Sequence, residues 1–303
     1  MIPVFLAIAP VFLLIMLGYG LRRGGIPSAE FWNLNDRLVY WVLMPALFFV
    51  KISQADLTSP ELISLSAVLY GSFFAAVAIG LLLSLRWGAA DGSSVMQGAA
   101  RFNTFIALAL AEALYGVPGL QIAVLGAAIL VPIVNVTIVS LMSFRLGAGK
   151  GGILGELIRN PLILSIFAGV VFNLLGWNGV PVLHDVAGIL GQAALPIMLM
   201  CVGANLKLRG LSAEGAPVLA SMFGKFVVFP MIAVLLIYLM QPAQLTAEVC
   251  ILFAALPVGV ATYSLSREMG GNASLMATVI TVQTVLSFLT LPFTVLLARM
   301  VLF

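Results

Sequence analysis

Two basic residues, Arg101 and Lys225, lie inside long apolar stretches of this 303-residue chain. An ionised side chain at the centre of a membrane helix costs on the order of 3 kcal/mol on insertion scales. Such residues therefore usually face a polar interior and mark the path of a substrate or an ion. The alternative is a structural ion pair, or a long side chain that reaches the membrane surface.

Acidic partners for these two cations are scarce. Glu112 is the acid expected well inside a span, and it lies roughly 16 Å along a helix from Arg101, too far for a direct pair. At least one cation is therefore expected to need an anionic substrate as its counter-ion. Arg101 could hold a carboxylate through two parallel hydrogen bonds, whereas Lys225 offers a point charge. Glu112 and Lys225 are also the candidates for proton coupling.

Neutral polar side chains could complete such a site by donating or accepting hydrogen bonds. For two of them, Asn135 and Gln283, helix packing is the favoured role. The candidates are Asn103, Thr104, Asn135, Thr262, Tyr263, Ser264 and Gln283.

The elements that must position these residues are membrane helices. Hydrophobic residues make up 62% of the chain, charged residues 8%, and the mean hydropathy is +1.19, more apolar surface than a soluble domain of this length can bury. Runs of about 20 apolar residues favour helices over barrel strands. The expected fold is all-α and polytopic, with ten spans at 2–21, 35–53, 60–86, 92–115, 119–145, 158–176, 185–205, 215–240, 245–268 and 273–302.

The fourth and ninth spans carry sequences that disrupt helices, Gly98 to Thr104 and Leu256-Pro257-Val258-Gly259. Both lie about ten residues from the start of their span, roughly 15 Å deep. A break there frees backbone groups, and the N-terminus of the outgoing half-helix attracts anions. Asn103 or Thr104 could cap one half-helix, and Pro257 suits the first turn of the other. The alternative is a simple kink without a ligand.

The two halves of the chain resemble each other at a nearly constant offset of 151 to 155 residues. Five spans per half is an odd number, so the second half would enter the membrane from the opposite side, as in the inverted repeats of many transporters. The predicted units are 1–146, a cytoplasmic linker at 147–157, and 158–303. The matches are Ile26-Pro27 with Val180-Pro181, Pro45 with Pro196, Gly71 with Gly224, Phe102 with Pro257, and Gly116 with Gly271.

The basic residues predict an orientation with both termini outside. One side then holds ten of the fourteen, the other side holds Lys51 and Arg299, and Arg101 and Lys225 remain inside helices. The ten are Arg22, Arg23, Arg37, Arg86, Arg145, Lys150, Arg159, Lys207, Arg209 and Arg267.

Several kinds of function are not supported by the sequence. The single histidine, His184, is expected in an outer loop, so no metal or cofactor site is predicted, and no phosphate-binding Walker motif occurs. No base is positioned for an intramembrane enzyme. The small, scattered net charge of +3 does not suggest a nucleic-acid partner.

Motifs along the whole chain resemble the auxin efflux carrier family of membrane transporters, which includes plant auxin carriers and bacterial malonate or malate permeases. The most specific are Ala194-Leu-Pro-Ile-Met-Leu-Met-Cys-Val-Gly-Ala-Asn-Leu in the seventh span and Leu256-Pro257 through Gly271 in the ninth. Further matches are Arg159-Asn-Pro in the sixth span, Lys225 followed by Pro230 in the eighth, and Arg101-Phe-Asn103-Thr104 in the fourth.

This resemblance implies that the fourth and ninth helices cross at their breaks, and that Asn103, Pro257 and Lys225 inherit site roles. It also implies a scaffold of helices 1, 2, 6 and 7, often a dimer interface, beside a transport domain of helices 3–5 and 8–10 that moves like an elevator. Where bacterial relatives often have Gly-x-Pro, this chain has Ala107-Leu108-Ala109, which predicts a milder or shifted fourth-helix break.

The expected function is secondary transport of a small organic anion across a bacterial inner membrane, with a carboxylate or dicarboxylate such as malonate, malate or an auxin-like acid as cargo. A sodium-coupled bile-acid-type symporter is the alternative carrier, and a sensor or channel is the alternative class. The predicted helix-break residues are Phe102 and Pro257. The predicted substrate site comprises Arg101, Asn103, Thr104, Lys225, Pro257, Val258, Gly259, Thr262 and Tyr263.

Overall fold

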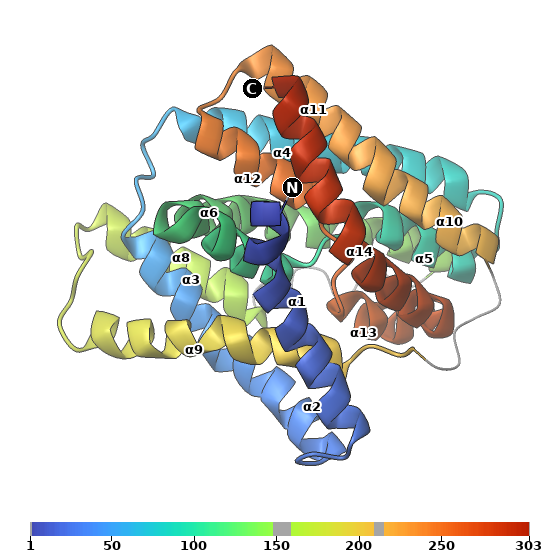
Figure 1. Ribbon diagram of the computed structural model, residues 1–303, viewed down its shortest axis with the longest axis horizontal. Coiled ribbons are helices and arrows are strands. Elements are labelled where there is room, and N and C mark those ends of the chain that lie inside the picture. The colour runs from blue at the N-terminus through green and yellow to red at the C-terminus, as the bar shows by residue number, and fades with distance from the viewer. Residues whose placement is uncertain (1, 148–158, 209–214, 303) are drawn as a thin grey trace.

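The computed structural model describes residues 2–147, 159–208 and 215–302, and every regular element within them is a helix (Figure 1). Most of the predicted linker lies outside these residues, as do Lys150 and Arg209 of the charge count. The elements are α1 (Ile2–Arg23), α2 (Ala29–Leu38), η1 (Val39–Leu43), α3 (Met44–Ser53), α4 (Glu61–Ser84), α5 (Ala89–Ala100), α6 (Thr104–Leu146), α8 (Pro161–Leu174), α9 (Leu183–Ala204), α10 (Gly215–Phe223), η2 (Gly224–Val228), α11 (Phe229–Met240), α12 (Gln244–Ala255), α13 (Ala261–Glu268) and α14 (Ala273–Leu302).

The all-helical prediction is confirmed, and each predicted span is helical over most of its length. By length and composition, α8 and α12 are shorter apolar helices, below the length of a full span. Six described stretches are long and apolar enough to cross a membrane: Val4–Arg23, Glu61–Ser84, Ala89–Leu146, Leu183–Ala204, Gly215–Met240 and Ala273–Leu302.

The fourth and fifth predicted spans are joined through a kink in α6 rather than through an open loop. Gly116 has φ 65° and ψ −157°, a backbone conformation that a residue with a Cβ rarely adopts. Pro118 follows two residues later, between the two predicted spans.

Two π-helical segments, η1 and η2, interrupt the second and eighth spans directly before Met44-Pro45 and Phe229-Pro230. Proline has no N–H, and its ring collides with the carbonyl four residues earlier. In each segment the residue before the proline bonds five residues back instead, Met44 to Val39 and Phe229 to Gly224. The wider turn accommodates the proline without ending the helix.

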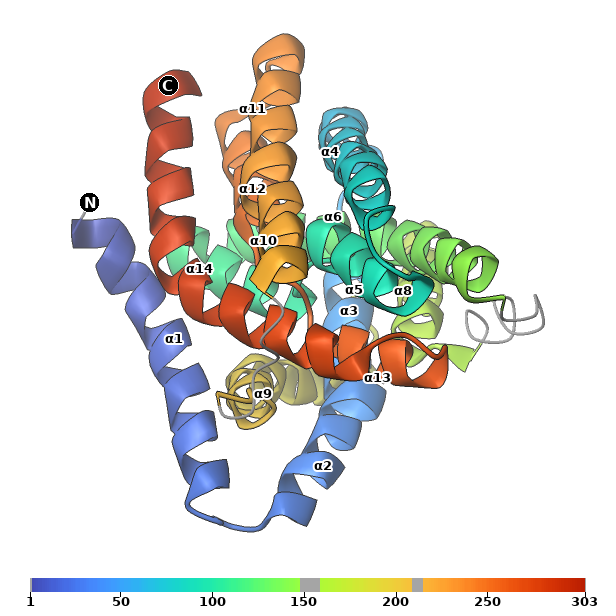
Figure 2. The same ribbon diagram turned by 90° about the vertical axis from the view of Figure 1, so that its right-hand side faces the viewer.

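One group of helices comprises α1, α3, α8 and α9, which pack against one another. Figure 2 shows α9 end-on between α1 and the α2–α3 segment. Backbones meet where α1 crosses α9, because a Cβ on Gly203 would overlap the Ile15 carbonyl, and a Cβ on Gly18 would overlap that of Met200. Small residues allow such close approach between membrane helices.

The second group comprises α4, α5, α10, α11, α12 and α14, and α6 contacts both groups. Here α5 fits closely between its neighbours. A Cβ on Gly80 of α4 would lie 2.9 Å from the Cβ of Ala99, and one on Gly98 would lie 2.8 Å from the Cβ of Ser221 in α10. This tight packing fixes the end of α5, where the helix stops.

Candidate functional site

The first break, residues 101–103, separates α5 from α6. Asn103 caps α6, because its side-chain oxygen accepts hydrogen bonds from the backbone N–H of Phe105 at 3.1 Å and of Ile106 at 3.2 Å. Thr104, the other predicted cap, is instead the first helical residue. The break lies at residues 101–103, where Arg101 and Asn103 have extended backbone, and Ala107 is already helical.

The second break, residues 256–259, separates α12 from α13. Pro257 lies within this extended segment, so its predicted place in the first turn of the following helix is wrong; Val260 precedes α13 instead. No side chain caps α13. The backbone N–H of Thr262 donates to the Gly259 carbonyl at 3.2 Å, and the buried Thr262 hydroxyl donates to the same oxygen.

The two breaks touch through their backbones. The N–H of Asn103 donates to the carbonyl oxygen of Pro257 at 2.8 Å. Gly259 faces the first break so closely that a Cβ there would lie 2.9 Å from the Phe102 carbonyl oxygen. Asn103 and Val258 are buried, and the amide nitrogen of the Asn103 side chain has no hydrogen-bond partner among the described residues.

Lys225 lies in η2 beside this contact and is fully buried. Its Nζ lies 4.1 Å from the Phe229 ring centroid and 6.0 Å from that of Phe102 in the first break. Aromatic faces attract a cation, but they do not replace its hydrogen bonds. Within the described part of the chain Nζ has no hydrogen-bond partner, so up to three donors are available to a ligand.

Arg101 opens the first break and points to a different partner. Its Nη2 donates to the side-chain oxygen of Asn135 in α6 at 3.1 Å, while its buried Nη1 lacks a partner among the described residues. Asn135 was predicted to pack helices, but here it orients the guanidinium. Arg101 therefore keeps spare donor capacity.

Two other predicted residues, Tyr263 and Glu112, have different surroundings from those of Asn103 and Lys225. Tyr263 in α13 carries the Nζ of Lys207 over its ring, 4.3 Å from the centroid. Glu112, a predicted coupling residue, is exposed on α6.

The structure contains a buried acid that the sequence interpretation missed. Glu248 in α12 forms an ion pair with Arg299, with 2.8 Å between Oε2 and Nη2, and accepts a second bond from Gln244. An acid four residues after a glutamine at the start of an apolar helix was the available signal. Glu112 is therefore not the sole acid inside a predicted span.

His184 is not in a loop, contrary to the prediction. It lies in the first turn of α9, is buried, and its Nε2 is 3.0 Å from the Ser53 hydroxyl of α3. This contact joins two helices of the first group and is distant in sequence from either break.

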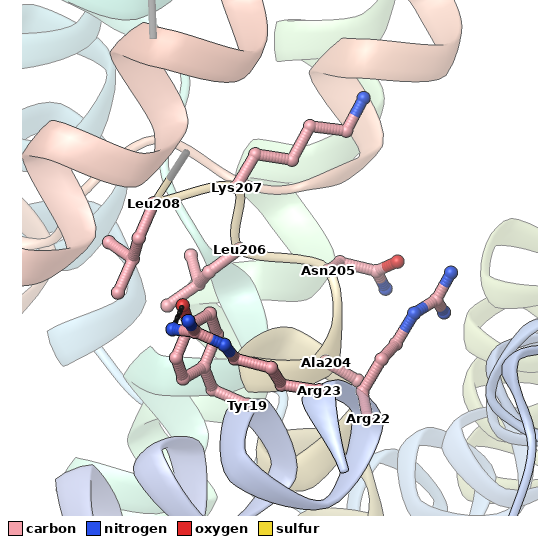
Figure 3. Close-up of a pocket in the computed structure, with 8 residues that line it drawn as sticks. All are labelled: Tyr19, Arg22, Arg23, Ala204, Asn205, Leu206, Lys207 and Leu208. Atoms are coloured by element: carbon pink, nitrogen blue, oxygen red, sulfur yellow. Dashed lines mark hydrogen bonds between the residues drawn. The ribbon is translucent and has the colours of Figure 1, made fainter. Parts of the chain in front are cut away.

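A pocket of about 360 Å³ opens where α1 and α9 end (Figure 3). Arg22, Arg23 and Lys207 give it three positive charges. The Arg23 guanidinium donates to the Tyr19 hydroxyl at 3.2 Å, and Lys207 connects the pocket to α13 through Tyr263. The pocket is also lined by Ala204, Asn205, Leu206 and Leu208.

Comparison with known proteins places this chain among transporters. The model of a family described as membrane transport protein matches residues 150–295. A Rhizobium meliloti protein named "Putative malonate transporter" is 29% identical over 305 residues, which cover 93% of this chain and 92% of the relative. A Methanothermobacter thermautotrophicus protein named "Uncharacterized transporter" is 25% identical over 297 residues, covering 93% and 94%.

Proposed function

Because this chain belongs to the auxin efflux carrier family of membrane transporters, we propose that it carries a small carboxylate or dicarboxylate across the bilayer. Malonate is the first candidate cargo, since the Rhizobium meliloti relative bears that name. Malate and an auxin-like acid share its chemistry. The carrier itself is a multi-pass membrane protein.

The buried Lys225 is the observation that carries this proposal. A buried cation with no hydrogen-bond partner among the described residues is costly, and an anion bound beside it would supply both a counter-charge and acceptors. Phe102 connects Lys225 to the first break, where Arg101 has an unused donor. Two cations near one crossing favour a cargo with two negative charges.

The crossing adds backbone groups to this proposed site. The residues around the two breaks, Asn103, Thr104 and 257–259, line the place where helices stop, and Thr262 and Tyr263 follow on α13. The unpartnered amide of Asn103 is a further donor for a carboxylate. Helix α6 presents its N-terminus there, whose dipole favours an anion.

The larger architecture is proposed as a five-plus-five inverted repeat with both termini outside, in a bacterial inner membrane. Its support is that each half contains one break at an equivalent position, and that both termini lie away from the α1–α2 turn (Figure 2). The π-helical segments do not follow this repeat, because η1 is in the second span and η2 in the eighth.

An elevator movement is proposed for the second group of helices against the first, which would form the scaffold and a homodimer interface. The two groups pack mainly within themselves, which is what a moving and a fixed part need. The basic pocket at the ends of α1 and α9 would concentrate anions at one entrance. Proton coupling through Lys225 or Glu112 is part of this proposal, and Glu112 is exposed on α6.

Uptake of radiolabelled malonate by the purified protein in liposomes tests the function. Lys225→Ala and Arg101→Ala are each expected to lower uptake about tenfold or more, because each removes a charged donor. Arg86→Ala, at an exposed position after α4, is the matched control. Wild-type uptake in both cation variants would contradict the site.

Malonate binding can be followed separately by thermal unfolding, because a ligand of the folded state raises the midpoint. Stabilisation together with flux is the expected result. Stabilisation without flux would support a sensor instead, and strictly sodium-dependent flux would support the symporter alternative.

A further inference from the structure

Gln283 lies in the first half of α14 and touches both broken helices. Its side-chain oxygen accepts a hydrogen bond from the backbone N–H of Val258 in the second break at 2.9 Å. Its amide nitrogen donates to the carbonyl of Gly98 near the end of α5, also at 2.9 Å. The side chain is fully buried.

Both partners are backbone groups left over by the breaks. In a continuous α-helix the Gly98 carbonyl would accept from residue 102, and the Val258 N–H would donate to residue 254. The backbone becomes extended after α5 and after α12, so neither of these helical hydrogen bonds can form. A buried backbone group without a partner costs as much as a lost hydrogen bond, and one amide replaces both.

The amide of Gln283 has little capacity left for a ligand. A glutamine amide has two N–H donors. One bonds Gly98, and the nitrogen also lies 3.4 Å from the Ser221 hydroxyl of α10, whose own hydrogen is directed to the Val218 carbonyl. Gln283 is thus suited to hold the site rather than to contact an anion.

We propose that Gln283 is a positioning residue that fixes the distance between the first and second breaks. A displacement of one break would therefore displace the other. The oxygen holds the second break and the nitrogen holds the helix that leads into the first. This inference rests on the proposed function of the crossing as the anion site, but its structural part can be measured without any substrate.

Hydrogen–deuterium exchange in lipid nanodiscs tests that part, using peptides that cover residues 99–106 and 254–261. Gln283→Met keeps a similar volume and removes both bonds, and is expected to speed exchange about tenfold in both peptides. Gln283→Asn is one methylene shorter and keeps the site polar should the methionine variant fail to fold; it cannot span both partners and is expected to act in the same direction.

Thr284→Val is the matched control. Thr284 is the next residue of α14, is buried, and its hydroxyl has no hydrogen-bond partner among the described residues. Its exchange should equal that of the wild type. Unchanged exchange in the glutamine variants, or faster exchange in the 254–261 peptide alone, would overturn the proposal.

Transport by the same variants connects the result to the site. The KM for malonate is expected to rise about tenfold in Gln283→Asn and to keep its wild-type value in Thr284→Val, because displaced breaks bind the anion poorly. Equal KM values would overturn the effect on the site. A wild-type protein that moves no carboxylate would contradict the proposed function, while the exchange result would still decide the role of Gln283.

Discussion

The two helix breaks meet at one backbone hydrogen bond, but they are stabilised in different ways. The first break contains its own cap, since Asn103 bonds two N–H groups at the start of α6. The second break has no side-chain cap and borrows partners from elsewhere, namely Gln283 of α14 and the N–H of Asn103. The first break therefore has a local side-chain cap in addition to its tertiary contacts, whereas the second has tertiary contacts and no such cap.

This difference has a consequence for how the breaks respond to change. A break with its own side-chain cap should lose stability when that cap is removed, in addition to any effect of losing the Gln283 contact. The second break has no side-chain cap, so it should be most sensitive at Gly259, where the backbone of the first break comes closest. Three substitutions test this contrast.

The largest effect is expected at the close approach itself. Gly259→Val would bring a branched side chain against the Phe102 carbonyl, where even a Cβ would lie at 2.9 Å, and overpacking costs about 1–3 kcal/mol. We expect a clearly lower thermal midpoint and loss of malonate uptake. Gly188→Val is the control, since a Cβ at position 188 of α9 meets no atom within 4 Å. Equal stability of the two variants would refute the close approach.

An intermediate effect is expected from the local cap. Asn103→Ala should destabilise the start of α6 by about 1 kcal/mol, whereas Asn103→Ser retains a capping oxygen and should recover most of that loss. Denaturant unfolding in detergent would measure both. If serine were as damaging as alanine, the contribution of Asn103 would lie outside capping.

The smallest effect is expected at Thr262. Thr262→Val keeps the shape of the buried side chain and removes one hydroxyl bond to Gly259, whose carbonyl still accepts from the backbone of residue 262. A loss of about 1 kcal/mol or less should follow. A change as large as that of Gly259→Val would show that this hydroxyl, rather than the backbone contact, holds the second break.

The locally determined features were the ones that the sequence could reveal. The cap at Asn103 needs only an asparagine before a helical segment, and the kink at Gly116 needs only a glycine with a proline two residues later. The helical content followed from apolar runs of membrane length. These signals act over a few residues, so they are visible in the chain itself.

The features that depend on distant contacts were missed or misplaced. Pro257 was assigned to a helical turn, but its carbonyl is held by Asn103, 154 positions earlier, and the segment stays extended. Gln283 looked like a packing residue because nothing near it in sequence indicates either partner. The ion pair of Glu248 spans 51 positions. A pattern along one helix cannot identify partners on another.

The hydrogen bond between the Asn103 N–H and the Pro257 carbonyl joins two main chains, and this has a consequence for how such a protein can evolve. Any residue with a backbone N–H could donate this hydrogen bond at position 103. The bond therefore constrains the backbone but does not constrain the side chains. Nearby side chains, such as Thr262 and Tyr263, can be substituted while this backbone hydrogen bond is kept. Proteins that share this backbone contact could therefore change their cargo by side-chain substitution while the contact between the two breaks is preserved.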